Sequence, residues 1–317
     1  MNFQQLKIIR ESARCNYNLT EVANTLFTSQ SGVSRHIREL EEELGIEIFI
    51  RRGKRLLGMT EPGKELLVVA ERILNDASNI RRLANVFSNN EIGQLVIATT
   101  HTQARYSLPL VIKEFRVLYP QVRLVLNQGT PDDIVAMLYS GEADIGIASE
   151  RLINDAALTT FPYYRWHHSV IVPENHPLTK EPLLTLEKLN TMPLITYRQG
   201  ITGRSRLDEA FQAAGMSPDI TLSAQDSDVI KTYVELGLGV GIVAHHAYDP
   251  MRDKGLVRLN AEHLFAANMV WLGLKKYQLQ RNYTLKFIQL CNRELGLSDI
   301  KERVFAENDD TVIDYQI

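Results

Sequence analysis

The chain has 317 residues, more than one ordinary domain needs, and its composition excludes several classes of protein. Hydrophobic residues make up 44% and charged residues 23%, proportions that exclude a disordered, collagen-like or low-complexity chain. The net charge is −3, but residues 1–58 hold nine Lys/Arg against seven Asp/Glu and residues 59–88 hold four of each, which leaves −5 for the remainder. The positive charge is therefore local to the N-terminal part, where it can meet phosphate groups at short range.

No segment has the pattern of a secreted or membrane-spanning protein. The N-terminal residues lack the unbroken apolar run of a signal peptide, and no window approaches the roughly 18 to 20 apolar residues of a membrane helix. The two cysteines, Cys15 and Cys291, lie too far apart for a Cys-rich zinc or redox motif. We expect a cytoplasmic protein of two or three domains, without a membrane partner.

The first sixty residues predict a helix-turn-helix. Apolar residues at helical spacing predict a first helix from about Phe3 and a second helix capped by Thr20. After a short turn, a third helix is expected over residues 30–44. Its apolar stripe is formed by Val33, Ile37, Leu40 and Leu44. This stripe would dock the third helix on its own domain and leave the opposite face outside.

The outer face of the third helix and the segment after it favour DNA binding. That face carries Ser31, Ser34, Arg35 and Arg38, whose hydroxyl and guanidinium groups can reach base edges in a major groove. A strand predicted over residues 45–50 leads into the basic sequence Arg51-Arg52-Gly53-Lys54-Arg55, which is typical of a hairpin wing that contacts phosphate. Each feature alone also fits a solvated charged surface, but their order along the chain favours a winged helix-turn-helix.

A long helix is predicted next, over residues 60–89, with Thr60 as its cap. Apolar residues then recur at alternating spacings of four and three: Leu66, Ala70, Ile73, Ala77, Ile80, Ala84 and Phe87. This heptad pattern indicates that the helix packs against its copy in a dimer, which would present two recognition helices to a two-fold related DNA site. The alternative is a single amphipathic helix that lies on its own domain.

Residues 90–317 alternate between predicted strands and helices, which indicates parallel, doubly wound sheets in two lobes with a cleft between them. Ligands in such folds bind where strands end and helices begin. Two such junctions, residues 99–103 and 200–205, are rich in hydroxyl groups, and Ser149 ends a further predicted strand. We expect a small anion held by these hydroxyls, the Gln103 amide and backbone N–H groups, although each Ser or Thr could instead cap its own helix.

The sequence carries no recognisable catalytic constellation. It has no G-x-S-x-G elbow, no H-E-x-x-H, no P-loop and no G-x-G-x-x-G after a strand. The pairs His167-His168 and His245-His246 would diverge on a strand and lack acidic ligands at metal spacing, so neither a metal nor a cofactor is expected. The alternatives to a regulator are a transport-type solute-binding protein and, less favoured, an enzyme fused to a DNA-binding domain.

Several segments resemble the LysR-type transcriptional regulators. The match is specific and lies in residues 28–37, in Leu40-Glu41, in Leu44-Gly45 and in residues 49–52. Residues 97–106, 200–205 and 228–233 resemble the sulfur-assimilation branch of that family, the CysB/Cbl branch. This likeness covers essentially the whole chain.

The resemblance implies an α/β protein with a winged helix-turn-helix at 1–59, a linker and dimerisation helix at 60–89, and a two-lobed effector domain of the periplasmic-binding-protein kind at 90–317. It implies a homodimeric or homotetrameric activator of sulfate-starvation genes that binds double-stranded promoter DNA and RNA polymerase. Its effector would be a sulfur-containing anion such as sulfate or adenylyl sulfate.

The candidate site residues form two sets. The candidate DNA contacts are Ser29, Gln30, Ser31, Ser34, Arg35, Arg38, Arg51, Arg52 and Lys54. The effector contacts that the resemblance implies are Thr100, Thr102, Gln103 and Thr202, with Trp166 nearby and Ser149 where relatives have Thr.

Overall fold

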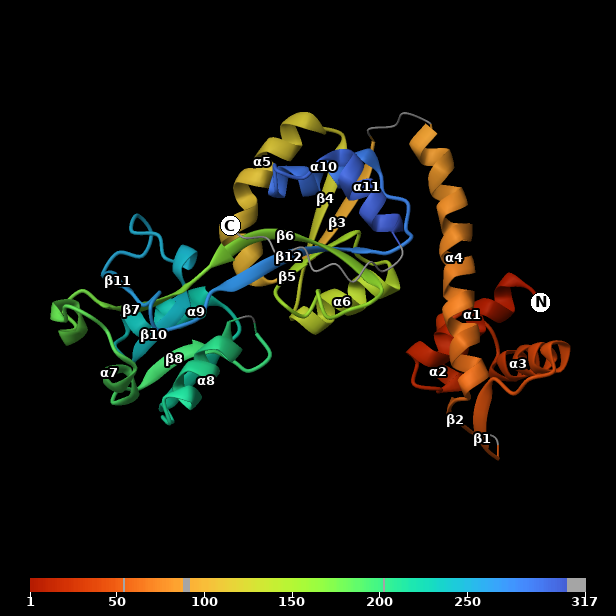
Figure 1. Ribbon diagram of the computed structural model, residues 1–317, viewed down its shortest axis with the longest axis horizontal. Helices are drawn as coiled ribbons and strands as arrows, with labels where there is room; N and C mark the ends of the chain where they lie inside the picture. Colours follow the sequence, from red (N-terminus) through yellow and green to blue (C-terminus); the bar gives the residue numbers. More distant parts are fainter. Residues whose placement is uncertain (54, 88–91, 202, 307–317) are drawn as a thin grey trace. The chain divides into compact units, whose positions relative to one another are not determined.

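The computed structural model describes residues 1–317 except 54, 88–91, 202 and 307–317; the side chains of 81, 82 and 84–87 are also left undescribed. The chain forms two compact units (Figure 1). The first comprises Met1–Ser88 with Tyr277–Leu279, and the second comprises Asn89–Lys276 with Gln280–Ile317. Within the described residues, no helix is both long and apolar enough to cross a membrane. The acidic residues 307–310 near the C-terminus lie outside the described part.

The first unit is a winged helix-turn-helix followed by a long helix, as the sequence predicts. Its elements are α1 (Phe3–Arg14), α2 (Leu19–Thr25), α3 (Gln30–Leu44), β1 (Phe49–Arg52), β2 (Arg55–Met59) and α4 (Glu61–Phe87). The predicted stripe of α3 is buried at Val33, Ile37 and Leu40, which pack with Ile8 and Val22 in one core. Leu44 is 39% exposed, because it lies at the end of the helix, beyond this core.

Two local predictions in this unit were wrong. The second helix is capped by Asn18, not Thr20: the Asn18 side chain accepts hydrogen bonds from the N–H groups of Thr20 and Glu21. The strand predicted from residue 45 begins only at Phe49. Gly45 ends α3 in the left-handed conformation, with φ of 67°, and the next N–H group bonds back to a carbonyl of the helix.

A single carboxylate ties the wing to the recognition helix. Oε1 of Glu41 accepts hydrogen bonds from the N–H groups of Ile48 and Phe49, at 3.0 and 3.3 Å. Oε2 of Glu41 forms an ion pair with Arg51 at 2.5 Å. The hairpin turns at Gly53, whose φ of +63° lies in the left-handed region. The orientation of the wing is therefore fixed by the same helix that carries the predicted DNA contacts.

Helix α4 starts as predicted, because the Thr60 hydroxyl accepts a hydrogen bond from the N–H of Gly63. Part of its apolar heptad seam is covered by the protein's own first domain. The seam residue Ala70, together with Leu74 next to the seam, packs against Leu6 of α1, so the N-terminal half lies on its own domain, as the alternative interpretation held. Further along, Ile80 is 68% exposed. The seam positions 84 and 87 fall among the side chains that are not described.

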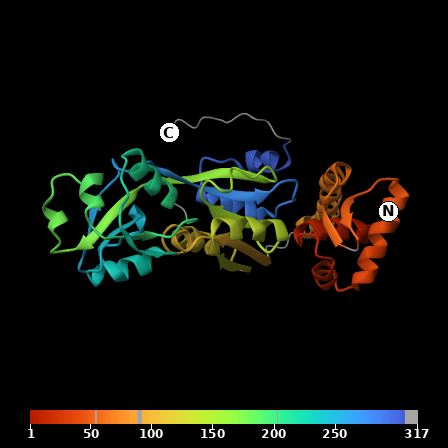
Figure 2. The same ribbon diagram turned by 90° about the horizontal axis from the view of Figure 1, so that it is seen from below.

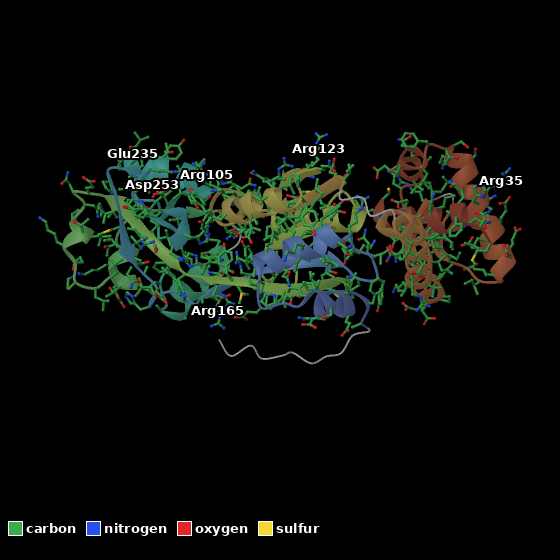
Figure 3. All side chains as sticks on the ribbon, turned by 90° about the horizontal axis from the view of Figure 1, so that it is seen from above. Arg35, Arg105, Arg123, Arg165, Glu235 and Asp253 are labelled. Atoms are coloured by element: carbon green, nitrogen blue, oxygen red, sulfur yellow. The ribbon has the colours of Figure 1, made fainter. Side chains whose placement is uncertain are left out.

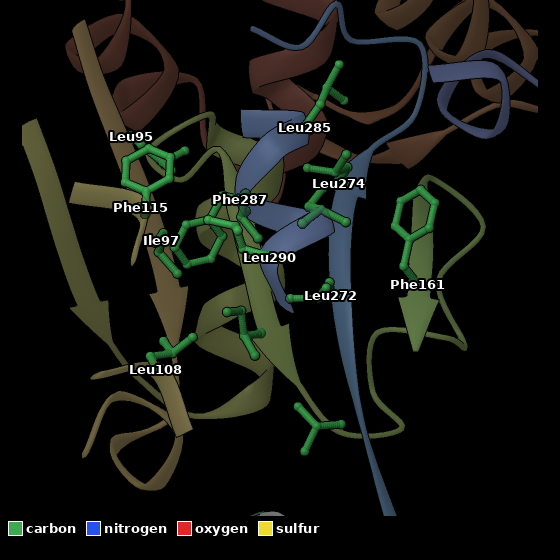
Figure 4. Packing of buried hydrophobic residues seen from close by; sticks show 14 of the residues in the cluster. Leu95, Ile97, Leu108, Phe115, Phe161, Leu272, Leu274, Leu285, Phe287 and Leu290 are labelled. Atoms are coloured by element: carbon green, nitrogen blue, oxygen red, sulfur yellow. The ribbon is translucent and has the colours of Figure 1, made fainter. Parts of the chain in front are cut away.

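The second unit has two lobes, each built on one five-stranded sheet. The sheet of lobe I runs in the order β4 (Val122–Gln128), β3 (Gly93–Thr99), β5 (Ile145–Ala148), β12 (Asn268–Lys275) and β6 (Leu158–Trp166). It is covered by α5 (Leu108–Leu118), α6 (Pro131–Ser140), α10 (Asn282–Cys291) and α11 (Leu297–Phe305). Figure 4 shows its core, in which Phe115 and Phe287 meet edge to face, with ring centroids 5.5 Å apart.

The sheet of lobe II runs in the order β11 (Leu256–Asn260), β7 (His168–Pro173), β10 (Val240–Ala244), β8 (Leu194–Tyr197) and β9 (Ile220–Ala224). Its helices are α7 (Leu186–Asn190), α8 (Arg204–Ala213) and α9 (Ser227–Glu235), with 3-10 turns at Pro177–Lys180 and His245–Ala247. The buried face centres on Leu207, Phe211 and Ile242.

The prediction of purely parallel sheets was wrong. β3, β4 and β5 pair in parallel, as do β8, β9 and β10, but β12 pairs antiparallel with β5 and β6, and β7 pairs antiparallel with β10 and β11. The reason is that the chain passes between the lobes twice, at residues 166–168 and 260–268 (Figure 2). These two crossings place the ends of the parallel strands at the junction of the lobes.

Candidate effector pocket and DNA-binding face

A pocket lies between the two lobes, at the C-terminal ends of their strands. The space between its lining atoms amounts to about 380 Å³, part of which is open to solvent. Its lining residues are Thr100, His101, Thr102, Gln103, Gly129, Trp166, Tyr197, Ile201, Gln225 and Ala244. They follow or end β3, β4, β6, β8, β9 and β10, as expected for a ligand site in sheets of this type.

The lobe I side of the pocket is a helix start that contains a π-helical turn, η1 (Gln103–Ser107). Gln103 is buried, and its Oε1 accepts hydrogen bonds from Ser107 Oγ at 2.8 Å and from the Tyr164 hydroxyl at 2.5 Å. Because both bonds are accepted by the amide oxygen, the amide nitrogen of Gln103 is the atom that can donate a hydrogen bond to an anion. Thr102 precedes η1 without capping it, so the capping alternative does not account for its hydroxyl.

The rest of the wall is closely packed around two aromatic side chains, Tyr197 at the end of β8 in lobe II and Trp166 at the end of β6, where the chain leaves lobe I. The buried Tyr197 hydroxyl lies 2.7 Å from Ser227 Oγ and accepts the N–H of Ala244 at 3.0 Å. Trp166 is 2% exposed, and its Nε1 has no hydrogen-bond partner among the described atoms. Gly203 has a φ of +89°, and a Cβ there would come within 2.5 Å of the Trp166 ring. Only glycine fits beside this wall of the pocket.

The polar groups that line the described part of the pocket include no lysine or arginine side chain. They are hydroxyls, carboxamides, an indole N–H and one imidazole. Helices start beside it on both sides: the helical turns that begin at His101, and α8 and α9 in lobe II. Helix N-termini present free N–H groups and a partial positive charge, so the site suits a small anion.

The structure brings most predicted effector residues together. Thr100, Thr102, Gln103 and Trp166 all line the pocket. Ser149 is buried just after β5 and is not among the lining residues, and Thr202 lies outside the described residues. His101 and Ile201 lie in the two predicted junctions but were not named as contacts, and the prediction missed Gly129, Tyr197, Gln225 and Ala244. Their positions at the ends of predicted strands were the available signal.

A polar network links the lobes next to the pocket. The Tyr106 hydroxyl of η1 donates to Asp228 Oδ1 of α9 at 2.5 Å, and Lys231 Nζ donates to that hydroxyl at 2.9 Å. Lys231 also pairs with Asp253 at 2.9 Å, and Arg105 Nε lies 3.3 Å from Asp228. Since Arg105 and Tyr106 lie two and three residues after the pocket residue Gln103, one short segment connects the pocket to this network.

The charges of the network stabilise one another. Burial opposes ionisation of Asp228, but the hydrogen bond from Tyr106 and the cations Lys231 and Arg105 outweigh it and lower the pKa of this carboxyl group. Burial, followed by the bond to Asp228, raises the pKa of Tyr106 to about 12. The hydroxyl is therefore protonated and acts as a donor to Asp228 at any physiological pH.

His101, Asp226 and Asp228 form a cluster that the sequence prediction did not include, with potential ligand atoms within 4.8 Å of one another. Both carboxylates of the cluster already have partners. Asp226 caps α9 by accepting the N–H of Val229, and Asp228 is held by Lys231 and Arg105. Asp228 is therefore already paired with cationic side chains of the protein.

The paired histidines lie at the junction of the lobes, and the prediction that all lie on strands was wrong. His245 and His246 form a 3-10 turn, and His245 Nδ1 accepts the N–H of His167 at 3.3 Å. The His168 and His246 rings both pack on Trp166, with centroids 4.9 and 6.0 Å away. Burial lowers the pKa of His168 and of His246 to about 4, so both rings are neutral at pH 7.

The predicted DNA contacts on α3 share its exposed face. Arg35 is 72% exposed, points away from the domain (Figure 3) and pairs with Glu39 at 3.3 Å. Arg38 is exposed and makes no ion pair within the described part of the chain. Ser29 caps the helix through the N–H of Gly32, and its Oγ lies 3.2 Å from that of Ser31.

The remaining candidates of this face differ in their surroundings. Gln30 is exposed in the first turn of α3, and Ser34 is half-buried one turn later. In the wing, Arg52 is exposed, whereas Arg51 is held by Glu41. Lys54 lies outside the described residues. The outer face of α3 therefore presents hydroxyls at its start and two guanidinium groups behind them, an arrangement that fits a major groove.

A winged helix-turn-helix in one unit and a pocket between two lobes in the other define a ligand-controlled DNA-binding protein. Two family models match: "Bacterial regulatory helix-turn-helix protein, lysR family" over residues 3–64 and "LysR substrate binding domain" over residues 88–296. The chain belongs to the LysR family of transcriptional regulators.

Several relatives are similar over their whole length. The chain is 68% identical to the HTH-type transcriptional regulator cbl of Escherichia coli, over 100% of both chains. It is 54% identical to the HTH-type transcriptional regulator SsuR of Burkholderia cenocepacia, over 95% of this chain and 97% of the relative. It is 44% identical to the CysB regulator of that organism, over 97% and 98%. The resemblance to the CysB/Cbl branch is thereby confirmed.

Solved structures agree with this assignment. The cofactor-binding domain of the Cbl transcriptional regulator matches at 61% identity with a TM-score of 0.67, over 69% of this chain and 96% of that one. The LysR-family regulator HinK of Pseudomonas aeruginosa shares the fold at 24% identity and a TM-score of 0.57, over 93% and 99%. The chain is a transcriptional regulator, as its relatives are, and neither a transport-type binding protein nor an enzyme.

Proposed function

We propose that this regulator controls sulfur-acquisition genes and that its effector is a small sulfur-containing anion, such as sulfate or adenylyl sulfate, bound in the pocket between the lobes. The observation that carries the proposal is the convergence of neutral donors at that pocket: Thr100, Thr102 and Gln103 from lobe I and Tyr197 from lobe II. A fully ionised sulfur oxyanion accepts hydrogen bonds and donates none, which matches these donors. Calorimetric titration of the full-length protein with each anion tests the assignment.

The effector would act by changing how tightly the lobes are joined. An anion that draws Thr102 and Gln103 toward lobe II moves the same segment that carries Tyr106. The bond from Tyr106 to Asp228 would then favour one arrangement of the lobes over another. A ligand shifts such an equilibrium only by its difference in affinity for the two arrangements.

We further propose that the protein acts in the cytoplasm as a homodimer or homotetramer and recruits RNA polymerase as an activator. Two exposed apolar helix faces support self-association through the effector domain. Leu110 and Val117 lie seven residues apart on α5, and Val229 and Tyr233 share one face of α9, which Leu236 continues just after the helix end. Exposed apolar faces of this kind are typical of protein interfaces.

For the DNA contact we expect Arg38→Ala to weaken operator binding about tenfold. Arg35→Ala should weaken it somewhat less, because Arg35 forms an ion pair with Glu39 in the same helix. Each substitution should also lower the slope of log affinity against log salt by about one. The measurement is fluorescence anisotropy of a labelled promoter duplex at several salt concentrations. Arg293→Ala, at an exposed ion pair of the effector domain, is the matched control. An unchanged affinity and salt slope in both α3 variants would refute the contact.

A further inference from the structure

Phe27 combines two features that a stable fold does not need. Its side chain is 97% exposed, the highest value among the exposed large hydrophobic residues described. Its backbone has a φ of +50°, in the left-handed region that glycine adopts most readily. A phenyl ring in water and a bulky residue at positive φ are both unfavourable for folding.

The hydrogen bonds of the turn show why the backbone takes this conformation. The N–H of Thr28 bonds to the carbonyl of Ala23, and the N–H of Phe27 bonds to the carbonyl of Asn24. These two bonds form the Schellman motif that ends α2, and Phe27 occupies its left-handed position, where glycine is the usual residue. The turn itself therefore gives no reason for an aromatic side chain.

The location of Phe27 points to DNA instead. It lies two residues before Ser29, the cap of α3, and residues 27–31 are exposed as one continuous run. The start of the recognition helix is the part that meets base edges in this class of domain. The base edge that accepts an apolar side chain in the major groove is the C5-methyl group of thymine, which Phe can contact.

We propose that Phe27 is a specificity-determining residue that contacts a thymine methyl group in each half-site of the operator. The inference rests on the DNA-binding function and extends it to a residue outside the polar face of α3. The ring adds apolar contact where Ser31, Arg35 and Arg38 add hydrogen bonds and charge. A strained, exposed residue is thereby retained for recognition at the cost of stability.

The test compares affinity with stability. A duplex is first selected from a randomised pool by the full-length wild-type protein, so that a failure to enrich any duplex counts against DNA binding itself. On that duplex, Phe27→Ala and Phe27→Gly should bind about five- to tenfold more weakly with an unchanged salt slope, because no charge is lost. Phe27→Gly should unfold at the same or a higher denaturant concentration than wild type. The matched control, Asn16→Gly, changes an exposed turn residue with φ of +48° and should leave affinity unchanged.

Replacing each thymine of the duplex by deoxyuridine removes one methyl group at a time and locates the contact. The affinity of the wild type for the duplex should fall two- to fivefold when the thymine at one position of each half-site is replaced. The affinity of Phe27→Ala should not fall when the same thymine is replaced. Equal affinity of wild type and Phe27→Ala overturns the proposal, and so does a deoxyuridine profile that is the same in both. A variant that binds DNA normally but fails to activate transcription would assign Phe27 to a protein partner and also overturn it.

Discussion

Replacing Thr100 and Thr102 by valine should abolish the response to the effector while basal DNA binding stays intact. Valine keeps the shape of threonine and removes only the hydroxyl group. A hydrogen bond to a charged ligand contributes about 1.5–3 kcal/mol, so each substitution should weaken anion binding roughly ten- to hundredfold. Both residues line the pocket in the second unit, whereas the DNA contacts belong to the first unit. Calorimetry with sulfate and adenylyl sulfate measures the first effect, and anisotropy on promoter DNA measures the second.

The control for this pair is Thr221→Val, at an exposed position of β9 away from the pocket lining. It should bind the anion as wild type does. The unfolding midpoint of every variant shows whether the lobes remain folded. Undiminished anion affinity in the double variant would move the effector site elsewhere, and loss of DNA binding together with anion binding would contradict two separate sites.

The effector domain should lose stability steeply in mild acid. His168 and His246 have an ordinary pKa of 6.5 when unfolded and a pKa of about 4 in the folded protein, because burial disfavours the charged ring. Above pH 6.5 neither state is protonated, and the full stability is present. Between pH 6.5 and 4 only the unfolded state takes up protons, so stability falls as the pH falls. By pH 4, each histidine should have lowered the free energy of unfolding by on the order of 3 kcal/mol.

Denaturant unfolding at pH 7.5, 6, 5 and 4.5 measures this loss. His246→Gln and His168→Asn should each flatten the profile, even where they lower stability at pH 7.5, because one titrating group is gone. His176→Gln, at a more exposed histidine of the same lobe, should leave the slope nearly unchanged. A wild-type profile that is flat between pH 7 and 5 would contradict the neutral, buried state of these rings.

The local elements were largely predictable because their signals lie within a few residues. Helix α3 has its cap, its apolar stripe and its polar face within fifteen residues, and the strands β3 and β4 are short apolar runs followed by helix starts. The crossing strands were not predictable in the same way. β6 and β12 pair with each other over a separation of about a hundred residues, and nothing in either segment specifies its partner.

The packing of α4 shows the same limit. A heptad pattern describes a stripe, but it does not say which surface covers it. Here Ala70 packs on α1 of its own domain, where it contacts Leu6, a residue far from it in the sequence. Ile80 further along is exposed, and that this part of the helix packs against a partner remains a prediction.

The pocket was predicted from strand ends rich in hydroxyl groups, and Thr100, Thr102 and Gln103 do meet there. Trp166 was expected there only from the family resemblance, and Tyr197, which was not predicted, reaches the pocket because the lobes come together. The link between Tyr106 and Asp228 joins residues 122 apart in the sequence, and only the folded second unit brings them within hydrogen-bond distance.

Footprinting of the full-length protein on promoters of sulfur-acquisition genes tests most directly whether anion binding controls DNA contact. The reactions contain no ligand, sulfate, adenylyl sulfate or O-acetylserine, with wild type and the Thr100→Val/Thr102→Val variant side by side. We expect a sulfur-containing anion to change the extent or pattern of wild-type protection and to leave the variant's footprint unchanged. Identical wild-type footprints under all conditions, or a response that persists in the variant, would contradict control through the pocket between the lobes.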